Sequence, residues 1–329
     1  MTSRFLQSGR WLIRDTFRQA RASGLLWVML SVSAVCILVC LSVGVSGPLS
    51  LKQDGEVVEF LPSGDPEAEK AKRSGVEIIR GELTLGFGAF HVPLGRDAGE
   101  AVRYIQMLLA GFIADTAGIL LALVWSAGFL PSFLDPASSA VLFAKPVPRW
   151  WLLLGKYLGV LGFLLVQAVV FVLGTWLALA IRTGIWDPVY LLCLPLLLLH
   201  FAVFFSFSTF VAVCTRSTVA SVIGSILFWL LCWGMNFGRH TMVVLESSNI
   251  SPLLMSMVEV GYWILPKPAD FGMILFDVLE AKKFFVQADA FRLVQNEGAF
   301  YPAWSLFSSA LFACVLVGLA QWQLRETDF

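Results

Sequence analysis

A short polar segment separates two long apolar runs in this chain: DPASSAVLFAKPVPRWWLLLGKYLG, residues Asp135–Gly159. Pro146 and Pro148 cannot both lie inside a regular helix, so the chain has to turn there. Trp150 and Trp151 follow at once, which suits the headgroup level where a transmembrane helix begins. The segment therefore predicts a loop between two membrane-spanning helices, and the rest of the chain is organised around it.

Composition indicates that most of the chain lies in lipid. The 329 residues are 58% hydrophobic and only 14% charged, whereas a soluble domain carries about 25% charged residues. A helix needs about 20 apolar residues to cross a bilayer. Six windows meet this length, so we predict an all-α polytopic membrane protein with a single domain over residues 1–329. The predicted transmembrane helices are 25–45, 104–130, 151–181, 189–213, 218–236 and 303–322.

The distribution of Lys and Arg predicts the orientation of these helices. Arginines crowd the N-terminal segment, and more cations lie in and just after 131–150, whereas segments 47–103 and 237–302 are net acidic. Cytoplasmic loops carry the excess of positive charge. We therefore expect both termini and the 131–150 loop in the cytoplasm. A cleaved signal peptide is the alternative for the basic start, but its apolar region should be shorter, about 7–15 residues.

The N-terminal residues 4–22 have the pattern of an interfacial helix. Four arginines recur on one face at helical spacing, and an apolar stripe lies on another face. A basic face with an apolar back is typical of a helix that lies along an anionic membrane surface. A solvated cytoplasmic tail is the alternative interpretation.

Each of the two long acidic segments, which we expect on the external side of the membrane, contains one predicted structural element. Residues 82–87 alternate apolar with polar or Gly residues, which is a weak strand signal and suggests a small external hairpin. The apolar stretch 252–266 is too short to span the bilayer. We therefore interpret it as a buried or re-entrant helix within the 237–302 segment.

The chain offers little material for enzyme chemistry. It has no P-loop, no Gly-x-Ser-x-Gly and no His-Glu-x-x-His motif, its three histidines are far apart, and its cysteines show no metal-binding spacing. We expect no catalytic residues, no metal and no cofactor in this chain.

Two polar residues at membrane depth still need an explanation. A carboxylate at a helix centre costs about 2.5–3.5 kcal/mol on insertion scales, and such residues mark function by default. Asp115 lies in the second predicted helix and His200 in the fourth. Asp115 could line or gate a pathway, or it could be a neutral or hydrogen-bonded structural group beside Thr116. His200 could be a ligand or a proton relay, although a satisfied core histidine is the simpler interpretation.

The segment Asp135–Gly159 resembles the permease subunits of ABC transporters of the type-2, exporter-like class. Those permeases carry an acidic residue, a Gly-Thr pair, then Ser-Lys-Pro-Val-Ser-Arg-Trp and Gly-Lys-Tyr or Gly-Lys-Phe. Here the matching parts are Asp135, the block Ala144–Trp150 and the block Gly155–Tyr157. The departures are Asp for Glu, Ala137-Ser138 for Gly-Thr, Ala144 for Ser and Pro148 for Ser.

The resemblance implies a partner and a set of coupling residues. In that family the loop between helices two and three docks on a separate ATP-binding subunit, which would hold ATP and Mg²⁺. The residues it implies for coupling are Asp135, Ser138, Lys145, Pro146, Arg149, Trp150 and Lys156. It also implies a second permease subunit, transport outward, and the plasma membrane, the inner membrane of a bacterium. We expect no nucleic-acid partner, and the substrate stays open.

Two other functions remain as alternatives. The chain could be a membrane scaffold or anchor that carries no substrate and binds an external partner through its acidic loops. It could also be an intramembrane enzyme, which would require paired polar residues near Asp115 or His200.

Overall fold

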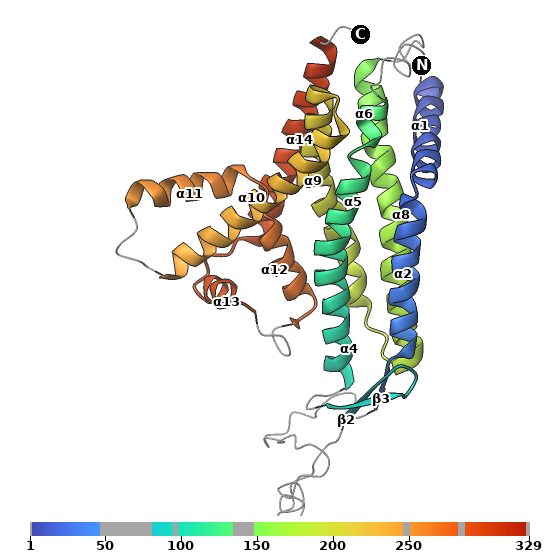
Figure 1. Ribbon diagram of the computed structural model, residues 1–329. Coiled ribbons are helices and arrows are strands. Elements are labelled where there is room, and N and C mark those ends of the chain that lie inside the picture. Colours follow the sequence, from blue (N-terminus) through green and yellow to red (C-terminus); the bar gives the residue numbers. More distant parts are fainter. Residues whose placement is uncertain are drawn as a thin grey trace, which may run out of the picture.

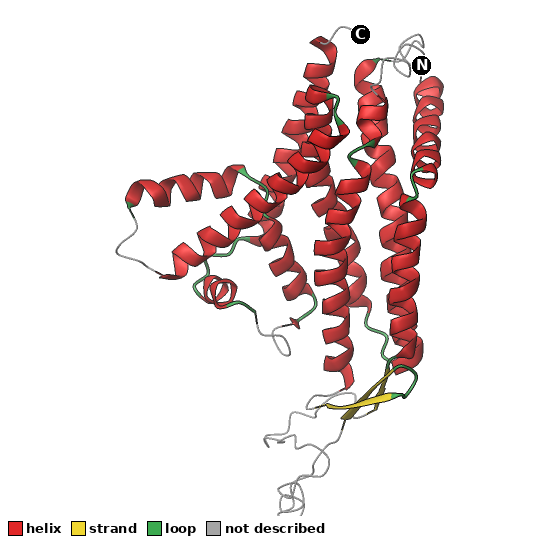
Figure 2. Cartoon of the chain, viewed as in Figure 1, coloured by secondary structure: helices red, strands yellow, loops and turns green. Residues whose placement is uncertain are grey.

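The computed structural model describes residues 2–46, 81–94, 98–133, 148–245, 251–281 and 287–326. Six helical runs in these ranges are long and apolar enough to cross a membrane. Helix dominates the chain, with one small sheet at an end of the bundle (Figure 2). The predicted class, an all-α polytopic membrane protein with six spanning helices, is confirmed.

The six runs are built from ten helical elements. In chain order these are α2 (Leu25–Ser42); α4 (Ala98–Met107), the π-helix η1 (Leu108–Gly118), α5 (Ile119–Ser126) and α6 (Phe129–Phe133) together; α8 (Arg149–Thr183); the 3₁₀-helix η2 (Pro188–Leu192) with α9 (Cys193–Thr215); α10 (Thr218–Leu245); and α14 (Pro302–Glu326).

Two runs are longer than the sequence pattern suggested. The second begins at Ala98 rather than at 104, and α10 continues past 236 to Leu245. Polar residues in these extensions have partners in the structure, since Arg103 pairs with Asp187 and Arg239 pairs with Glu259. Because paired polar residues do not end a helix, hydropathy alone placed the start of the second span too late and the end of α10 too early.

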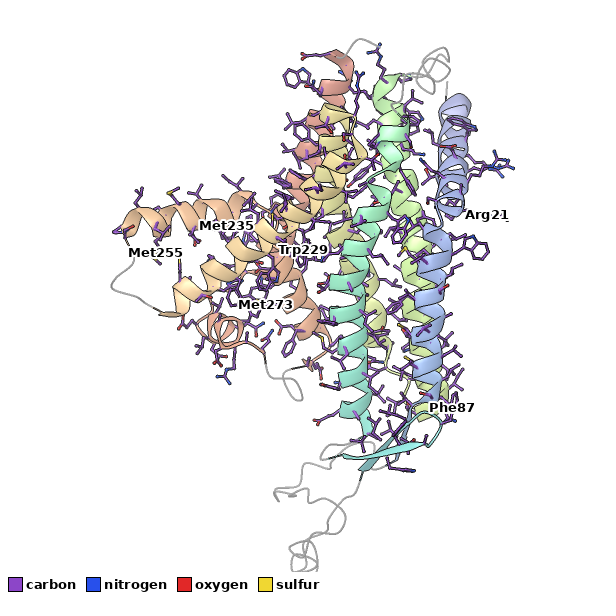
Figure 3. The ribbon with its side chains drawn as sticks, viewed as in Figure 1. Arg21, Phe87, Trp229, Met235, Met255 and Met273 are labelled. Carbon is purple, nitrogen blue, oxygen red and sulfur yellow. The ribbon has the colours of Figure 1, made fainter. Side chains whose placement is uncertain are left out.

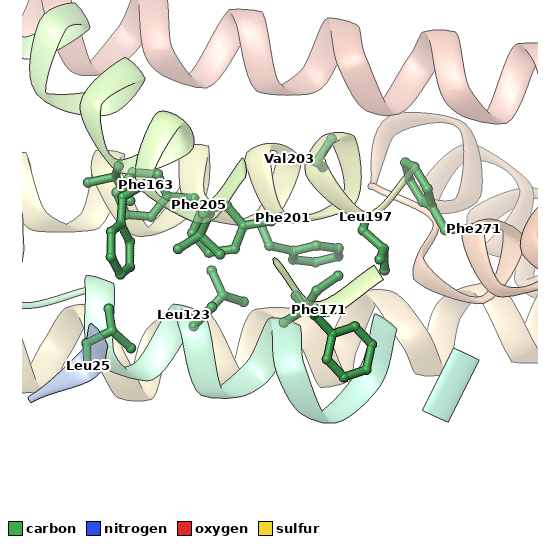
Figure 4. Close-up of a cluster of buried hydrophobic side chains, with 14 of the residues drawn as sticks. Leu25, Leu123, Phe163, Phe171, Leu197, Phe201, Val203, Phe205 and Phe271 are labelled. Carbon is green, nitrogen blue, oxygen red and sulfur yellow. The ribbon is translucent and has the colours of Figure 1, made fainter. Parts of the chain in front are cut away.

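The interior of the bundle is filled by aromatic and branched side chains from α5, α8 and α9. Phe163, Phe201 and Phe205 are buried, and the rings of Phe201 and Phe205 stack with centroids 5.2 Å apart (Figure 4). Tyr157 stacks on Phe205 and donates a hydrogen bond to the carbonyl of Ala202. Lipid is as apolar as these side chains, so close packing and such hydrogen bonds, rather than exclusion of water, stabilise the bundle.

The N-terminal helix α1 (Thr2–Ala22) packs lengthwise on α8, nearly in line with α2 (Figure 1). Leu12 and Thr16 are buried against α8, where Gly159 allows close approach: a Cβ there would lie 2.7 Å from the Thr16 hydroxyl. In the structure α1 thus runs along the bundle, and the predicted position of residues 4–22 along the membrane surface stays a prediction. The apolar face of α1 covers α8, while Arg10, Arg14, Arg18 and Arg21 are exposed.

A small antiparallel sheet closes the end of the bundle opposite the termini (Figure 1). It consists of β1 (Gly44–Ser46), β2 (Gly81–Leu85) and β3 (Phe90–Leu94), in the order β1-β2-β3. The expected hairpin is present, and β2 covers most of the alternating stretch 82–87. Gly44 lies opposite Thr84, where a Cβ would come within 2.5 Å of the Thr84 hydroxyl.

Between α10 and α14 the chain forms a lateral group of helices: α11 (Pro252–Ile264), α12 (Pro268–Val278) and α13 (Asp289–Asn296). Figure 1 shows α10 and α11 projecting from the side of the bundle, with α12 lying back against it. We expected residues 252–266 to be buried or re-entrant. The prediction that this stretch is buried within the chain is wrong, because most of α11 is exposed, including Leu253 and Met257. The buried helix of this group is α12.

Candidate pathway and coupling sites

Asp115 and His200, which the sequence singled out separately, form a pair inside the bundle. The Nδ1 atom of His200 lies 2.7 Å from a carboxylate oxygen of Asp115, and both residues are buried. Thr116 does not serve Asp115, because its hydroxyl donates to the carbonyl of Gly111. Asp115 thus has a hydrogen-bond partner, which is His200 and not Thr116, and its role in a pathway stays a prediction.

A local irregularity in the second span places Asp115. Residues Leu108–Gly118 form a π-helix, in which each turn holds an extra residue. Such segments are rare and occur frequently at functional sites. The wider turn shifts side chains around the helix axis relative to the α-helices on either side. Asp115 consequently points at α9 and at a cavity beside α10 and α12.

The second nitrogen of His200 bears on the tautomer of this residue. Nε2 is buried and has no hydrogen-bond partner among the described residues. A tautomer with its proton on Nε2 would leave a buried N–H unpaired there, at a cost of about 1–3 kcal/mol. We therefore assign the tautomer in which Nδ1–H donates to Asp115.

A second buried carboxylate lies close by, at the start of α12. Asp270 accepts hydrogen bonds from His240 at 2.7 Å, from Asn236 at 2.8 Å and from Tyr262 at 2.7 Å, and also one from Ser305. The side chains of Asp270 and His240 are completely buried. These donors come from α10, α11 and α14. Asp270 therefore joins α12 to all three of these helices.

The protonation state of Asp270 follows from its donors. Burial by itself would raise the pKa of Asp270, but hydrogen bonds from His240, Ser305 and Tyr262 outweigh it and hold the pKa below its usual range. Asp270 is thus a carboxylate at neutral pH. The neighbouring Lys267 is also buried, and this burial lowers the pKa of its ammonium to about 8.

The Asp270 cluster contains the residue types of a hydrolytic triad but not the geometry. Its hydroxyl groups, Ser305 and Tyr262, donate to the carboxylate and not to an imidazole. A nucleophilic serine requires a base on its own hydroxyl and access to a substrate. Ser305 is only 1% exposed. The arrangement thus suits a structural junction between helices.

Sequence reasoning missed this cluster. Asp270 lies outside the apolar windows, and His240 was placed beyond the predicted end of the fifth helix. One signal was present: Asn236 and His240 are four residues apart, so they share a helix face if the helix continues. Extending that helix would have shown two polar groups that need a partner.

The structure places three of the seven coupling residues that the resemblance implies. Asp135, Ser138, Lys145 and Pro146 lie outside the described residues. Helix α8 begins directly after Pro148, as the proline pattern predicted, so Arg149 and Trp150 form its first turn. Trp150 packs edge-on against Trp151.

Arg149 connects the start of α8 with the end of α14. Its Nη1 donates to the carbonyl of Leu324 at the end of α14, over a distance of 3.4 Å. The start of α8 and the end of the last spanning helix are therefore in contact.

Lys156 lies inside the structure rather than on its surface. Its ammonium is 1% exposed and donates to Asp15 at 2.9 Å and to Gln19 at 2.7 Å, both on α1. A side chain in this position cannot contact another protein directly. Any role of Lys156 in coupling would have to act through its contacts with α1 and with the ring of Phe133 on α6, which lies 5.6 Å from its ammonium.

Six apolar spans and buried charged pairs define a multi-pass helical membrane protein. A family model described as ABC-2 family transporter protein matches residues 10–317, and the chain belongs to this family. It is therefore a permease of the ABC transporter type, as the segment around residues 135–159 indicated. A comparison with curated proteins found no match to the chain.

Proposed function

We propose that this chain is the membrane-spanning subunit of an ATP-driven exporter and works with a separate ATP-binding subunit. ATP and Mg²⁺ would bind to that partner, and loop 131–150 of this chain would dock on it. Two permease subunits and two ATP-binding subunits would make the complete transporter, located in the plasma membrane, the inner membrane of a bacterium. ATP hydrolysis would then take place outside this chain.

One observation carries this proposal: the ends of the chain and the ends of the loop gather at one basic end of the bundle. Both termini, the end of α6 and the start of α8 lie at this end, opposite the sheet (Figure 1). The exposed arginines of α1 lie there too. Excess positive charge is typical of the cytoplasmic side of a membrane protein. This supports a cytoplasmic location for the loop, where an ATP-binding subunit would be found.

The structure also suggests how force could travel from the loop. Helix α8 runs unbroken for 35 residues from Arg149, so a displacement of its first turn would move the whole helix. Arg149 contacts α14 and Lys156 contacts α1, so these helices would follow. Closure of two ATP-binding subunits would then bring the cytoplasmic ends of both permeases together and switch access to a pathway between them.

Affinity purification of the tagged chain from its native membrane tests the proposal. Wild-type protein should co-purify with a P-loop ATPase in equal amounts. Arg149→Glu should reduce the recovered ATPase and its activity at least tenfold, because it reverses a charge beside the loop. Arg216→Glu is the control, since Arg216 ends α9 at the same end of the bundle but outside the loop.

The outcome has to be separated from misfolding, because Arg149 also bonds to Leu324. Membrane insertion and the melting temperature of Arg149→Glu should stay close to those of the wild type. An unchanged yield of active ATPase with well-folded Arg149→Glu would overturn coupling through this loop. Recovery of the chain with only an external partner would instead favour the alternative function, a membrane scaffold that carries no substrate.

A further inference from the structure

A cavity of about 290 Å³ lies between η1, α10, α12 and α13, beside Asp115. Ligand sites usually measure about 300–1,000 Å³, so this one suits a small molecule. Several aromatic side chains line its wall, and Figure 3 shows two wall residues, Trp229 on α10 and Met273 on α12, where the lateral helices meet the bundle. The aromatic residues of the wall are Phe112, Trp229, Trp233, Phe276 and Phe291.

Asp115 provides the one formal charge among the described residues that line the cavity. Its side chain is 10% exposed, and its only hydrogen bond among the described residues joins one oxygen to His200. No Lys or Arg side chain is among the described residues that line the cavity. A carboxylate in an apolar environment is costly without a partner, so the site favours a positively charged ligand.

The wall chemistry indicates which kind of cation would bind. A metal ion requires several oxygen, nitrogen or sulfur ligands. No group of three such acidic, histidine or cysteine side chains occurs in the described part of the chain, and the Thr116 hydroxyl donates elsewhere. Aromatic faces, in contrast, attract ammonium groups by cation–π interaction and accept apolar bodies.

We infer that this cavity binds a small organic monocation with an apolar or aromatic body, held by the Asp115 carboxylate and the surrounding indole and phenyl rings. Asp115 supplies the charge, and Trp233, which is 41% exposed, supplies an aromatic face. Binding at this site does not depend on the ATP-binding subunit. It can therefore be measured on this chain alone, whether or not the coupling proposal holds.

Phenyltrimethylammonium and tert-butylbenzene form a matched pair of probes, because they share one shape and differ by one positive charge. The full-length protein, purified in detergent, is titrated with the cation by calorimetry. Saturable binding to the wild type is expected, with an affinity at least tenfold weaker in Asp115→Asn. The substitution keeps an oxygen for the His200 N–H, so the fold should be retained.

Two further variants locate the ligand. Trp233→Leu should weaken binding about two- to fivefold, as expected for loss of one cation–π contact of 0.5–1 kcal/mol. Asp289→Asn is the control, because this carboxylate starts α13 near the cavity but is 79% exposed and paired with Arg292. It should leave the affinity unchanged.

Three results would overturn the inference. The first is equal affinity of Asp115→Asn and wild type for the cation. The second is displacement of the cation by tert-butylbenzene at comparable concentrations, which would mark an apolar cavity without charge selection. The third is the absence of saturable binding to the wild type up to about 10 mM, tenfold above a millimolar dissociation constant. Matching melting temperatures of all variants exclude unfolding as the cause.

Discussion

The ring of Phe271 lies flat against the imidazole of His200, with ring centroids 4.8 Å apart and 13° between the planes. Phe271 follows Asp270 directly, so one turn of α12 touches both buried Asp–His pairs of the described chain. The junction of Asp270 with three helices therefore also positions the ring that covers His200. A movement of α12 would alter both pairs at once.

Loss of the Asp270 carboxylate should destabilise the protein strongly. Asp270→Ala would leave the buried polar groups of His240, Asn236 and Tyr262 without their acceptor. Breaking a buried pair costs about 3–5 kcal/mol, so we expect a clear fall of the melting temperature in detergent. Asp289→Ala is the control, since its exposed pair should contribute below about 1 kcal/mol. Similar melting temperatures for both variants would contradict a stabilising role of the junction.

The contact of α1 with α8 should depend on Gly159. Gly159→Leu would place a side chain where Thr16 now lies, 2.7 Å from the Cβ position, and should detach α1. Hydrogen exchange in α1 should then rise by at least tenfold. Gly162→Leu on the same helix is the matched control, because nothing lies within 4 Å of its Cβ position. Equal protection of α1 in the two variants would show that this close approach is not required.

The ion pair between Lys156 and Asp15 should respond asymmetrically to mutation. Asp15 is 41% exposed, whereas Lys156 is 1% exposed. Asp15→Ala strands a buried ammonium with Gln19 as its remaining acceptor, whereas Lys156→Met removes the buried charge and leaves an exposed carboxylate. Asp15→Ala should therefore lower stability by about 3 kcal/mol, and Lys156→Met by much less. Thermal unfolding of both variants and of the double variant gives the coupling free energy between Asp15 and Lys156. A larger loss of stability in Lys156→Met than in Asp15→Ala would refute this account.

Stability should rise with pH because of Lys267. Burial lowers the pKa of its ammonium from 10.5 to about 8. Between these values the unfolded chain binds a proton that the folded chain does not, so stability increases as pH rises from about 8 to 10.5. Below pH 8 the buried ammonium lowers the stability of the folded protein by about 3 kcal/mol, since each pKa unit corresponds to roughly 1.4 kcal/mol.

Lys267→Met should remove that cost and flatten this part of the pH profile. The variant should melt higher than the wild type at pH 7, and the difference should shrink toward pH 10.5. Thermal unfolding in detergent at several pH values measures both curves. Parallel curves for the two proteins would show that Lys267 does not titrate in this window.

Cysteine labelling should establish the orientation of the bundle. Phe87 is exposed at the tip of the β2–β3 hairpin, and Arg18 is exposed on α1 at the other end. In a chain whose exposed Cys214 and Cys314 are replaced by Ser, an impermeant maleimide should label Phe87→Cys in intact cells. Arg18→Cys should react only after permeabilisation. The reverse pattern would invert the proposed topology.

Sequence by itself determined the membrane-spanning architecture of this protein. Hydropathy over about 20 residues is a local property, so the apolar windows identified six spans before any contact was known. Local chemistry also placed the turn before Arg149, since two prolines exclude a continuous helix, and the alternation at 82–87 indicated a strand. The motif around Asp135–Gly159 pointed to the family.

Only the tertiary structure decided how the polar residues are used. Asp115 meets His200 across 85 residues of sequence, and Lys156 meets Asp15 across 141. Hydropathy records that such residues are costly in lipid but not which partner offsets the cost. That partner depends on how helices rotate and pack against one another, and here a π-helical turn and close glycine contacts set the rotation. The buried pairs and the cavity beside Asp115 follow from this packing.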